Sequence, residues 1–176
     1  MTQVFSLSDD AIDRFAGRYA SYLDASPSSY HAAAEGARLL EEAGFTRVDR
    51  RDPWPTAAGH YVLTEQGALI AWVARDPGVP LRSFAVVGAH SDSPALRLKP
   101  TPEHRGPDGW GQLAVQVYGG ALLNSWLDRE LLLAGQVVTR DGASHLVRTE
   151  PIARVSQLAP HLDRAVHSEG LKLDRQ

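Results

Sequence analysis

A histidine and an aspartate lie two residues apart at the end of an apolar run, and their side-chain types suit metal chemistry. The run reads Ala85-Val86-Val87-Gly88-Ala89-His90-Ser91-Asp92. A neutral imidazole is a good zinc ligand, and a carboxylate at this spacing either binds the metal or orients the imidazole through its other ring nitrogen. One imidazole and one carboxylate do not complete a metal site, so His90 and Asp92 form at most part of one.

A purely structural interpretation of the same pair is also open. A histidine at a strand end commonly bonds to a nearby carbonyl, and Asp92 precedes Ser93-Pro94, a sequence typical of a turn that an aspartate caps. The residues by themselves do not decide between this interpretation and the metal site.

The elements that would position the pair form an α/β sheet. Residues 84–89 are apolar throughout, which predicts a strand covered on both faces, and ligands gather at the carboxyl ends of strands in such sheets. Ser8 is a predicted N-cap for a helix of about four turns, and a second helix is predicted from about Tyr30 to Ala43, ended by Gly44. Residues 61–64 and 68–74 are typical of a hairpin. Two helices before a buried strand favour a layered α/β domain.

The pattern changes after Pro94. Residues 95–99 and 113–118 alternate between apolar and polar, and residues 131–139 and 145–147 flank a turn. Residues 100–111 are rich in Pro and Gly and are predicted to be a connection. This pattern indicates an antiparallel β unit, so we expect one domain at 1–95 and another at 96–176.

Composition narrows the function classes. The net charge of −3 gives no basic surface for nucleic acid and no polybasic patch for a membrane. The chain has no cysteine, so any metal must be held by His, Asp or Glu. Residues 1–7 lack the basic start of a signal peptide, and no stretch is long and apolar enough to span a bilayer. We therefore expect a cytoplasmic protein.

Four stretches, in order along the chain, resemble the aspartyl aminopeptidases, a family of zinc exopeptidases with a paired-metal site. The first is 23–32, and the second, 88–99, resembles the first metal motif of the family. The third, 118–131, resembles its Tyr-Gly-Gly to Trp-x-Asp-Arg segment. The fourth, 151–162, resembles a histidine-bearing segment of its inserted domain.

The resemblance implies a part of a layered metallopeptidase catalytic domain, followed by part of an antiparallel β domain that mediates oligomerisation. It implies His90 as a zinc ligand and Asp92 as the catalytic carboxylate that orients it. His161 matches a substrate-binding histidine that reaches a neighbouring subunit. The implied substrates are peptides with an N-terminal Asp or Glu. Two zinc ions are implied, and His, Asp and Glu ligands also accept Co²⁺ or Mn²⁺.

Family members are more than twice as long as this chain, and their general base and other metal ligands lie beyond the stretches matched here. We therefore expect an N-terminal portion that has negligible peptidase activity alone. Two alternatives stay open: a non-catalytic assembly module derived from the family, and an unrelated α/β binding protein. Asp128 and Arg129 are predicted to form a charge pair beside Trp126. Each of the remaining histidines is expected to be structural or on the surface.

Overall fold

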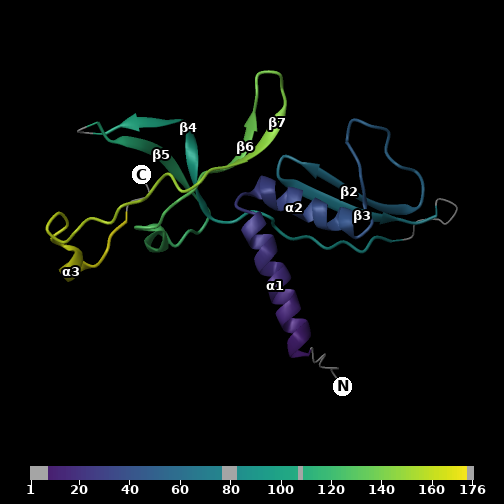
Figure 1. The fold of residues 1–176 in the computed structure, drawn as a ribbon, viewed down its shortest axis with the longest axis horizontal. Coiled ribbons are helices and arrows are strands. Elements are labelled where there is room, and N and C mark those ends of the chain that lie inside the picture. Colours follow the sequence, from purple (N-terminus) through teal and green to yellow (C-terminus); the bar gives the residue numbers. More distant parts are fainter. Residues whose placement is uncertain (1–7, 77–82, 107–108, 174–176) are drawn as a thin grey trace. The chain divides into compact units, whose positions relative to one another are not determined.

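The computed structural model describes residues 8–76, 83–106 and 109–173. Figure 1 shows its helices and strands. Its contacts divide the chain into two units. Unit 1 comprises Met1–Asp92 and Ala134–Arg148, and unit 2 comprises Ser93–Leu133 and Thr149–Gln176. The two domains expected at 1–95 and 96–176 stay a prediction, because these units are defined by contacts within one structure and not by domain boundaries in the family. Residues 1–7, for which the sequence predicts no signal peptide, lie outside the described ranges.

Helix α1, Asp9–Ala25, begins as the sequence predicts. The Ser8 side chain accepts a hydrogen bond from the Ala11 amide, and Asp9 and Asp10 lie in the first turn, where they complement the helix dipole. None of its residues is buried. The Tyr22 hydroxyl donates to the Ala32 carbonyl at 3.3 Å and so links α1 to the next helix.

Helix α2, Ser29–Glu42, also has its ends specified locally. Ser28 caps its first turn. At the other end Gly44 has φ +92°, its amide bonds to the Glu41 carbonyl, and the next amide bonds to the Leu40 carbonyl. This is a Schellman motif, which confirms the predicted role of Gly44.

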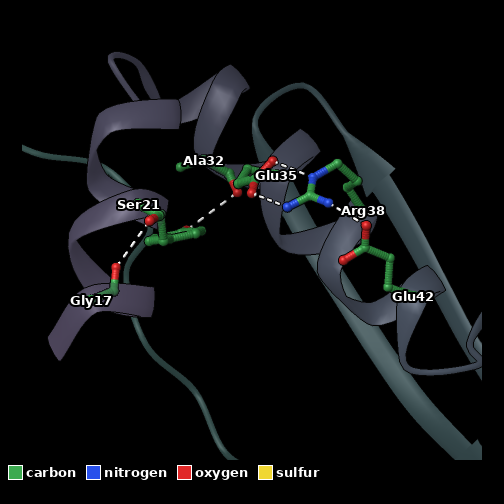
Figure 2. Close-up of polar contacts among 7 residues, drawn as sticks. Gly17, Ser21, Ala32, Glu35, Arg38 and Glu42 are labelled. Atoms are coloured by element: carbon green, nitrogen blue, oxygen red, sulfur yellow. Dashed lines mark hydrogen bonds and ion pairs between the residues drawn. The ribbon is translucent and has the colours of Figure 1, made fainter. Parts of the chain in front are cut away.

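An ion-pair chain runs along the exposed side of α2. Arg38 donates to Glu35 at 2.6 Å and to Glu42 at 2.5 Å, as Figure 2 shows. The hydrogen bond from Arg38 lowers the pKa of the Glu35 carboxyl. These groups lie one helical turn apart, and Arg38 and Glu42 are exposed to solvent, where such pairs contribute little to stability.

Three strands form the sheet of unit 1, in the order β1-β2-β3. They are β1 (Thr46–Arg47), β2 (Gly59–Glu65) and β3 (Ala68–Ala74). β1 pairs with β2 in parallel, and β2 pairs with β3 in antiparallel fashion. Gln66 and Gly67 have φ +48° and +82°, the pattern of the two-residue turn that matches strand twist. The predicted hairpin is confirmed.

The core of the described chain lies where α2 packs on this sheet. Its six buried apolar residues all come from α2 and β2: Ala32, Ala33, Ala37, Tyr61, Val62 and Leu63. Small residues on α2 permit a close approach, since a Cβ added at Gly36 would lie 3.2 Å from the Leu69 side chain on β3. We call α2 together with β1, β2 and β3 the α2–sheet layer.

Residues 84–89, predicted to be a strand covered on both faces, form no strand in the structure. Phe84, Val86 and Val87 are 79%, 85% and 98% exposed. The prediction is wrong for the described chain, because a strand needs a hydrogen-bonding neighbour and none of the described strands pairs with this segment. Each exposed side chain also forgoes about 1.5–3 kcal/mol of burial.

A second hairpin belongs to unit 1. It consists of β6 (Ala134–Val138) and β7 (Ser144–Arg148), joined through the predicted turn at Gly142. The guanidinium of Arg148 donates to the Asp24 carbonyl at 3.1 Å, next to the junction of α1 and α2.

Unit 2 contains an antiparallel pair, β4 (Ala95–Arg105) and β5 (Gly111–Tyr118). β4 continues through Pro100 and Pro102, so the prediction that 100–111 is a connection is wrong for 100–105. The register between the strands shifts between Leu98 and Glu103. Prolines are tolerated at such irregularities because the backbone there forms no hydrogen bond between the strands that would require an N–H group.

Two isolated bridges, between Leu127 and Val155 and between Leu131 and Ala153, connect further segments of unit 2. Unit 2 also includes the 3₁₀ helix η2 (Leu123–Trp126) and the short helix α3 (Val166–Glu169). The Asp128 carboxylate accepts a hydrogen bond from the Gln157 amide at 3.2 Å. No Asp128–Arg129 ion pair is present among the described residues, so that prediction is wrong: Asp128 bonds to the backbone of a neighbouring segment instead. No helix in the described ranges has the length and apolar character needed to cross a membrane.

Candidate metal centre

We call residues 83–92, which carry the candidate metal ligand, the His90 segment. Near its end the Ser91 hydroxyl donates to the Gly67 carbonyl at 3.3 Å, in the turn between β2 and β3. The sequence contains no signal for this contact, because it joins residues 24 positions apart. The contact brings the end of the His90 segment to the edge of the α2–sheet layer.

His90 and Asp92 interact directly. The Asp92 carboxylate oxygen lies 3.2 Å from His90 Nδ1, and the Asp92 backbone carbonyl lies 3.0 Å from the same nitrogen. A proton on Nδ1 would satisfy both oxygens, which leaves Nε2 unprotonated with its lone pair directed outward. The His90 side chain is 85% exposed, and Nε2 makes no hydrogen bond within the described ranges.

This geometry fits one ligand of a zinc site with its orienting carboxylate. It does not fit a whole site. Within residues 8–76, 83–106 and 109–173, no three His, Asp or Glu side chains gather closely enough to bind one metal ion. Zinc in proteins takes at least three protein ligands, so the described residues alone do not build a zinc centre.

His161, the predicted substrate-binding residue, lies in unit 2. It is exposed in a turn that follows Pro160, and two amides of this turn, those of Leu162 and Asp163, bond to the Ala159 carbonyl. Because His161 and His90 belong to different units, the role of His161 stays a prediction.

The environment of His31 is the most distinctive among the other histidines. Its Nδ1 lies 2.8 Å from the Ser28 hydroxyl, at the start of α2. Burial lowers the pKa of this imidazole, and the positive charge of Arg148 lowers it further. The contact with Ser28 gives His31 a structural role at the start of α2.

Comparison with known proteins identifies the family. The family model described as aminopeptidase I zinc metalloprotease (M18) matches residues 22–176. A probable M18 family aminopeptidase 2 from Streptomyces avermitilis is 52% identical over 157 residues, which are 89% of this chain and 36% of the relative.

Solved structures agree with the fold. A chain in a complex of Ape4 and Nbr1 is 28% identical, with a TM-score of 0.77 over 97% of this chain and 35% of its own. An M18 aminopeptidase from Thermotoga maritima, 24% identical, has the same fold, with a TM-score of 0.76 over 94% of this chain and 36% of its own.

The chain thus spans about a third of the length of its relatives and corresponds to their N-terminal portion. The expected mixed α/β metallopeptidase fold is confirmed, and the alternative of an unrelated α/β binding protein is wrong. This chain belongs to the M18 family of zinc metalloaminopeptidases.

Proposed function

We propose that this chain is the N-terminal part of a zinc aminopeptidase that removes Asp or Glu from the N-termini of peptides. In this proposal His90 is one zinc ligand and Asp92 orients it. His161 binds substrate in a homo-oligomer, and the enzyme works in the cytoplasm. The complete site holds two zinc ions, which Co²⁺ or Mn²⁺ can replace.

The observation that supports this proposal is the contact between Asp92 and His90 Nδ1. A carboxylate on one ring nitrogen fixes the imidazole tautomer and raises the basicity of the other nitrogen, as in many zinc sites. The exposure of the ring matters equally, because a histidine buried by its own unit could not meet further ligands. When zinc is bound, it supplies Lewis acidity and lowers the pKa of bound water.

The chain alone lacks the remaining ligands, so its own contribution is to hold and orient one ligand. We expect no measurable hydrolysis of Asp- or Glu-p-nitroanilide by the purified chain with zinc. Zinc-dependent release of p-nitroaniline by the chain alone would contradict the proposal that it is an incomplete catalytic unit.

A chimera tests the residue assignments. In it the chain is joined to the region of the Streptomyces avermitilis aminopeptidase that follows the matched part. We expect the chimera to prefer Asp and Glu substrates over Leu. His90→Ala should abolish hydrolysis, and Asp92→Asn should lower activity or zinc affinity by about 10–100-fold.

His104→Ala is the matched control, since His104 is an exposed histidine of β4 to which no role is assigned. This variant should keep the activity of the chimera. Equal activity of the His90→Ala and His104→Ala chimeras would overturn the ligand assignment. A preference for Leu over Asp would overturn the substrate assignment alone.

A non-catalytic assembly module is the second candidate, and the exposed apolar side chains of the His90 segment favour it. Such a module would bind M18 subunits while the chimera stayed inactive with every substrate. Size-exclusion chromatography together with the p-nitroanilide assay separates the two candidates.

A further inference from the structure

The contact with Asp92 orients the His90 ring but does not place it in unit 1. The Asp92 carboxylate and carbonyl oxygens, 3.2 and 3.0 Å from Nδ1, fix the ring relative to a backbone only two residues away. The groups of a binding site must be held to within about 0.5 Å by supporting contacts on rigid elements. The peptide that carries His90 and Asp92 therefore needs an anchor of its own on the rest of the unit.

The stretch that precedes His90 provides no such anchor. Residues 84–89 form no strand, and none of their backbone groups bonds to another described residue. Val86 and Val87 are 85% and 98% exposed, so side-chain packing does not hold this stretch either. The described chain thus reaches His90 without support from the α2–sheet layer.

Ser91, between the candidate ligand and its carboxylate, makes a contact of the required kind. Its hydroxyl donates to the Gly67 carbonyl at 3.3 Å. The acceptor is well placed, because Gly67 has φ +82° in the tight turn of the β2–β3 hairpin. A Cβ at Gly67 would lie 3.2 Å from the Ser29 hydroxyl, so the turn also packs closely against the start of α2. Ser91 is therefore joined to the layer that contains the core of unit 1.

The chain that follows Asp92 has different neighbours. Residues 93–133 belong to unit 2, in which a Cβ added at Gly119 would lie 3.5 Å from the Pro94 ring. Gly119 follows Tyr118, which pairs with the first residue of β4. The Ser91 hydrogen bond thus ties the candidate ligand to unit 1 at the point where the chain leaves that unit.

We propose that Ser91 is a positioning residue for the zinc ligand, because its hydrogen bond to the Gly67 carbonyl holds His90 and Asp92 on the α2–sheet layer. The inference rests on the proposed function, in which His90 binds zinc. In it Ser91 touches neither metal nor substrate and acts through the place at which it holds the peptide. Such a hydrogen bond shifts an equilibrium by about two- to tenfold, which sets the size of the expected effects.

The first test measures backbone order in the isolated chain by the ¹⁵N heteronuclear nuclear Overhauser effect. Ser91→Ala should lower the values at residues 90–92 toward those of a mobile loop and leave those of β2 unchanged. Ser91→Thr keeps the hydroxyl and should retain the wild-type values at residues 90–92.

Ser21→Ala is the matched control, because the Ser21 hydroxyl makes the same kind of exposed bond, to the Gly17 carbonyl at 3.0 Å in α1 (Figure 2). This variant should leave the order of residues 90–92 unchanged. Unchanged order in Ser91→Ala, or an equal loss in Ser91→Ala and Ser91→Thr, would overturn the inference. An equal loss in Ser21→Ala would overturn it as well.

The second test measures the zinc affinity of the chimera by competition with a chelator. Ser91→Ala should raise the zinc dissociation constant about two- to tenfold, whereas Ser91→Thr and Ser21→Ala should not. Saturating zinc should return kcat of Ser91→Ala to the wild-type value with KM unchanged, which a defect in folding alone would not allow. An unaltered zinc affinity of Ser91→Ala would overturn the inference.

The order and affinity measurements do not use hydrolysis. A chimera that binds zinc in this pattern and cleaves no acidic substrate would therefore overturn the proposed function and leave this inference standing.

Discussion

The α2–sheet layer and the His90 segment, both in unit 1, contain similar apolar residues but bury them to very different extents. The α2–sheet layer places Val62 at 0% exposure, inside a packed strand and beneath a helix of small residues. The His90 segment, twenty-odd residues later, leaves Val87 at 98% exposure. Both are valines in apolar runs, and the difference is that β2 has a strand on each side whereas residues 84–89 have none in the described structure.

In unit 1, one region provides the stability and another carries the candidate metal ligand. The α2–sheet layer contains its own hydrogen-bond partners and its own core. The His90 segment holds the candidate ligand and is attached to the layer by the Ser91–Gly67 contact. Residues of one type should therefore respond very differently to the same substitution in the two regions.

The two regions should differ most when one valine in each is replaced by aspartate. Val62→Asp should destabilise unit 1 by about 3 kcal/mol or more, because it buries an unpaired carboxylate. Val87→Asp should change the free energy of unfolding of the isolated chain by less than about 0.5 kcal/mol, as exposed positions usually do. Urea denaturation followed by circular dichroism measures both values. Similar losses from the two variants would contradict the comparison.

The turn that joins the two regions gives the next effect. Gly67→Ala should cost about 1–2 kcal/mol, because φ +82° is unfavourable for an L side chain and the new Cβ would lie 3.2 Å from the Ser29 hydroxyl. Gly17→Ala, in α1 with open space around it, should instead stabilise by about 0.5–1 kcal/mol. The same denaturation experiment compares them, and a stabilising Gly67→Ala would show that the turn is not formed as described.

The stability of the α2–sheet layer should depend on pH through the ionisation of His31. Burial and Arg148 lower the pKa of this histidine in the folded chain, so the unfolded chain binds the proton first as the pH falls. Its contribution to stability is complete above the unfolded pKa of about 6.5 and is lost as the pH drops below that value. His31→Gln should flatten the decrease in stability between pH 7.5 and 5.5, as measured by denaturation at several pH values. An unchanged slope would contradict the assignment.

The smallest effect is expected at the surface of α2. Arg38→Gln removes the ion pairs to Glu42, which is exposed to solvent, and to Glu35, whose side chain is 16% exposed. The variant should lower the unfolding midpoint slightly at low salt and not measurably in 1 M NaCl, because salt screens such pairs. A loss that persists at high salt would indicate that Arg38 contributes through packing instead.

Local features of the fold could be predicted from the sequence. Ser8 as an N-cap, Gly44 after α2 and the β2–β3 hairpin each depend on a few adjacent residues, and the structure confirms all three. The connection predicted at Pro100 and Pro102 is wrong, because the register shift that accommodates these prolines depends on pairing with β5.

The candidate site could be predicted only in part. The spacing of His90 and Asp92 placed the two groups within reach of each other, and the structure has them in contact. Their sequence also predicted a buried strand at 84–89, which depends on neighbouring strands that no local pattern can supply. The contact of Ser91 with Gly67 could not be predicted for the same reason, since it joins segments far apart in sequence.

Hydrogen exchange of the isolated chain tests most directly whether the candidate ligand lies outside the self-sufficient part of unit 1. The account predicts strong protection for the amides of Tyr61, Val62 and Leu63, and exchange close to that of an unfolded peptide for residues 84–89. Equal protection of the two sets of amides would contradict it.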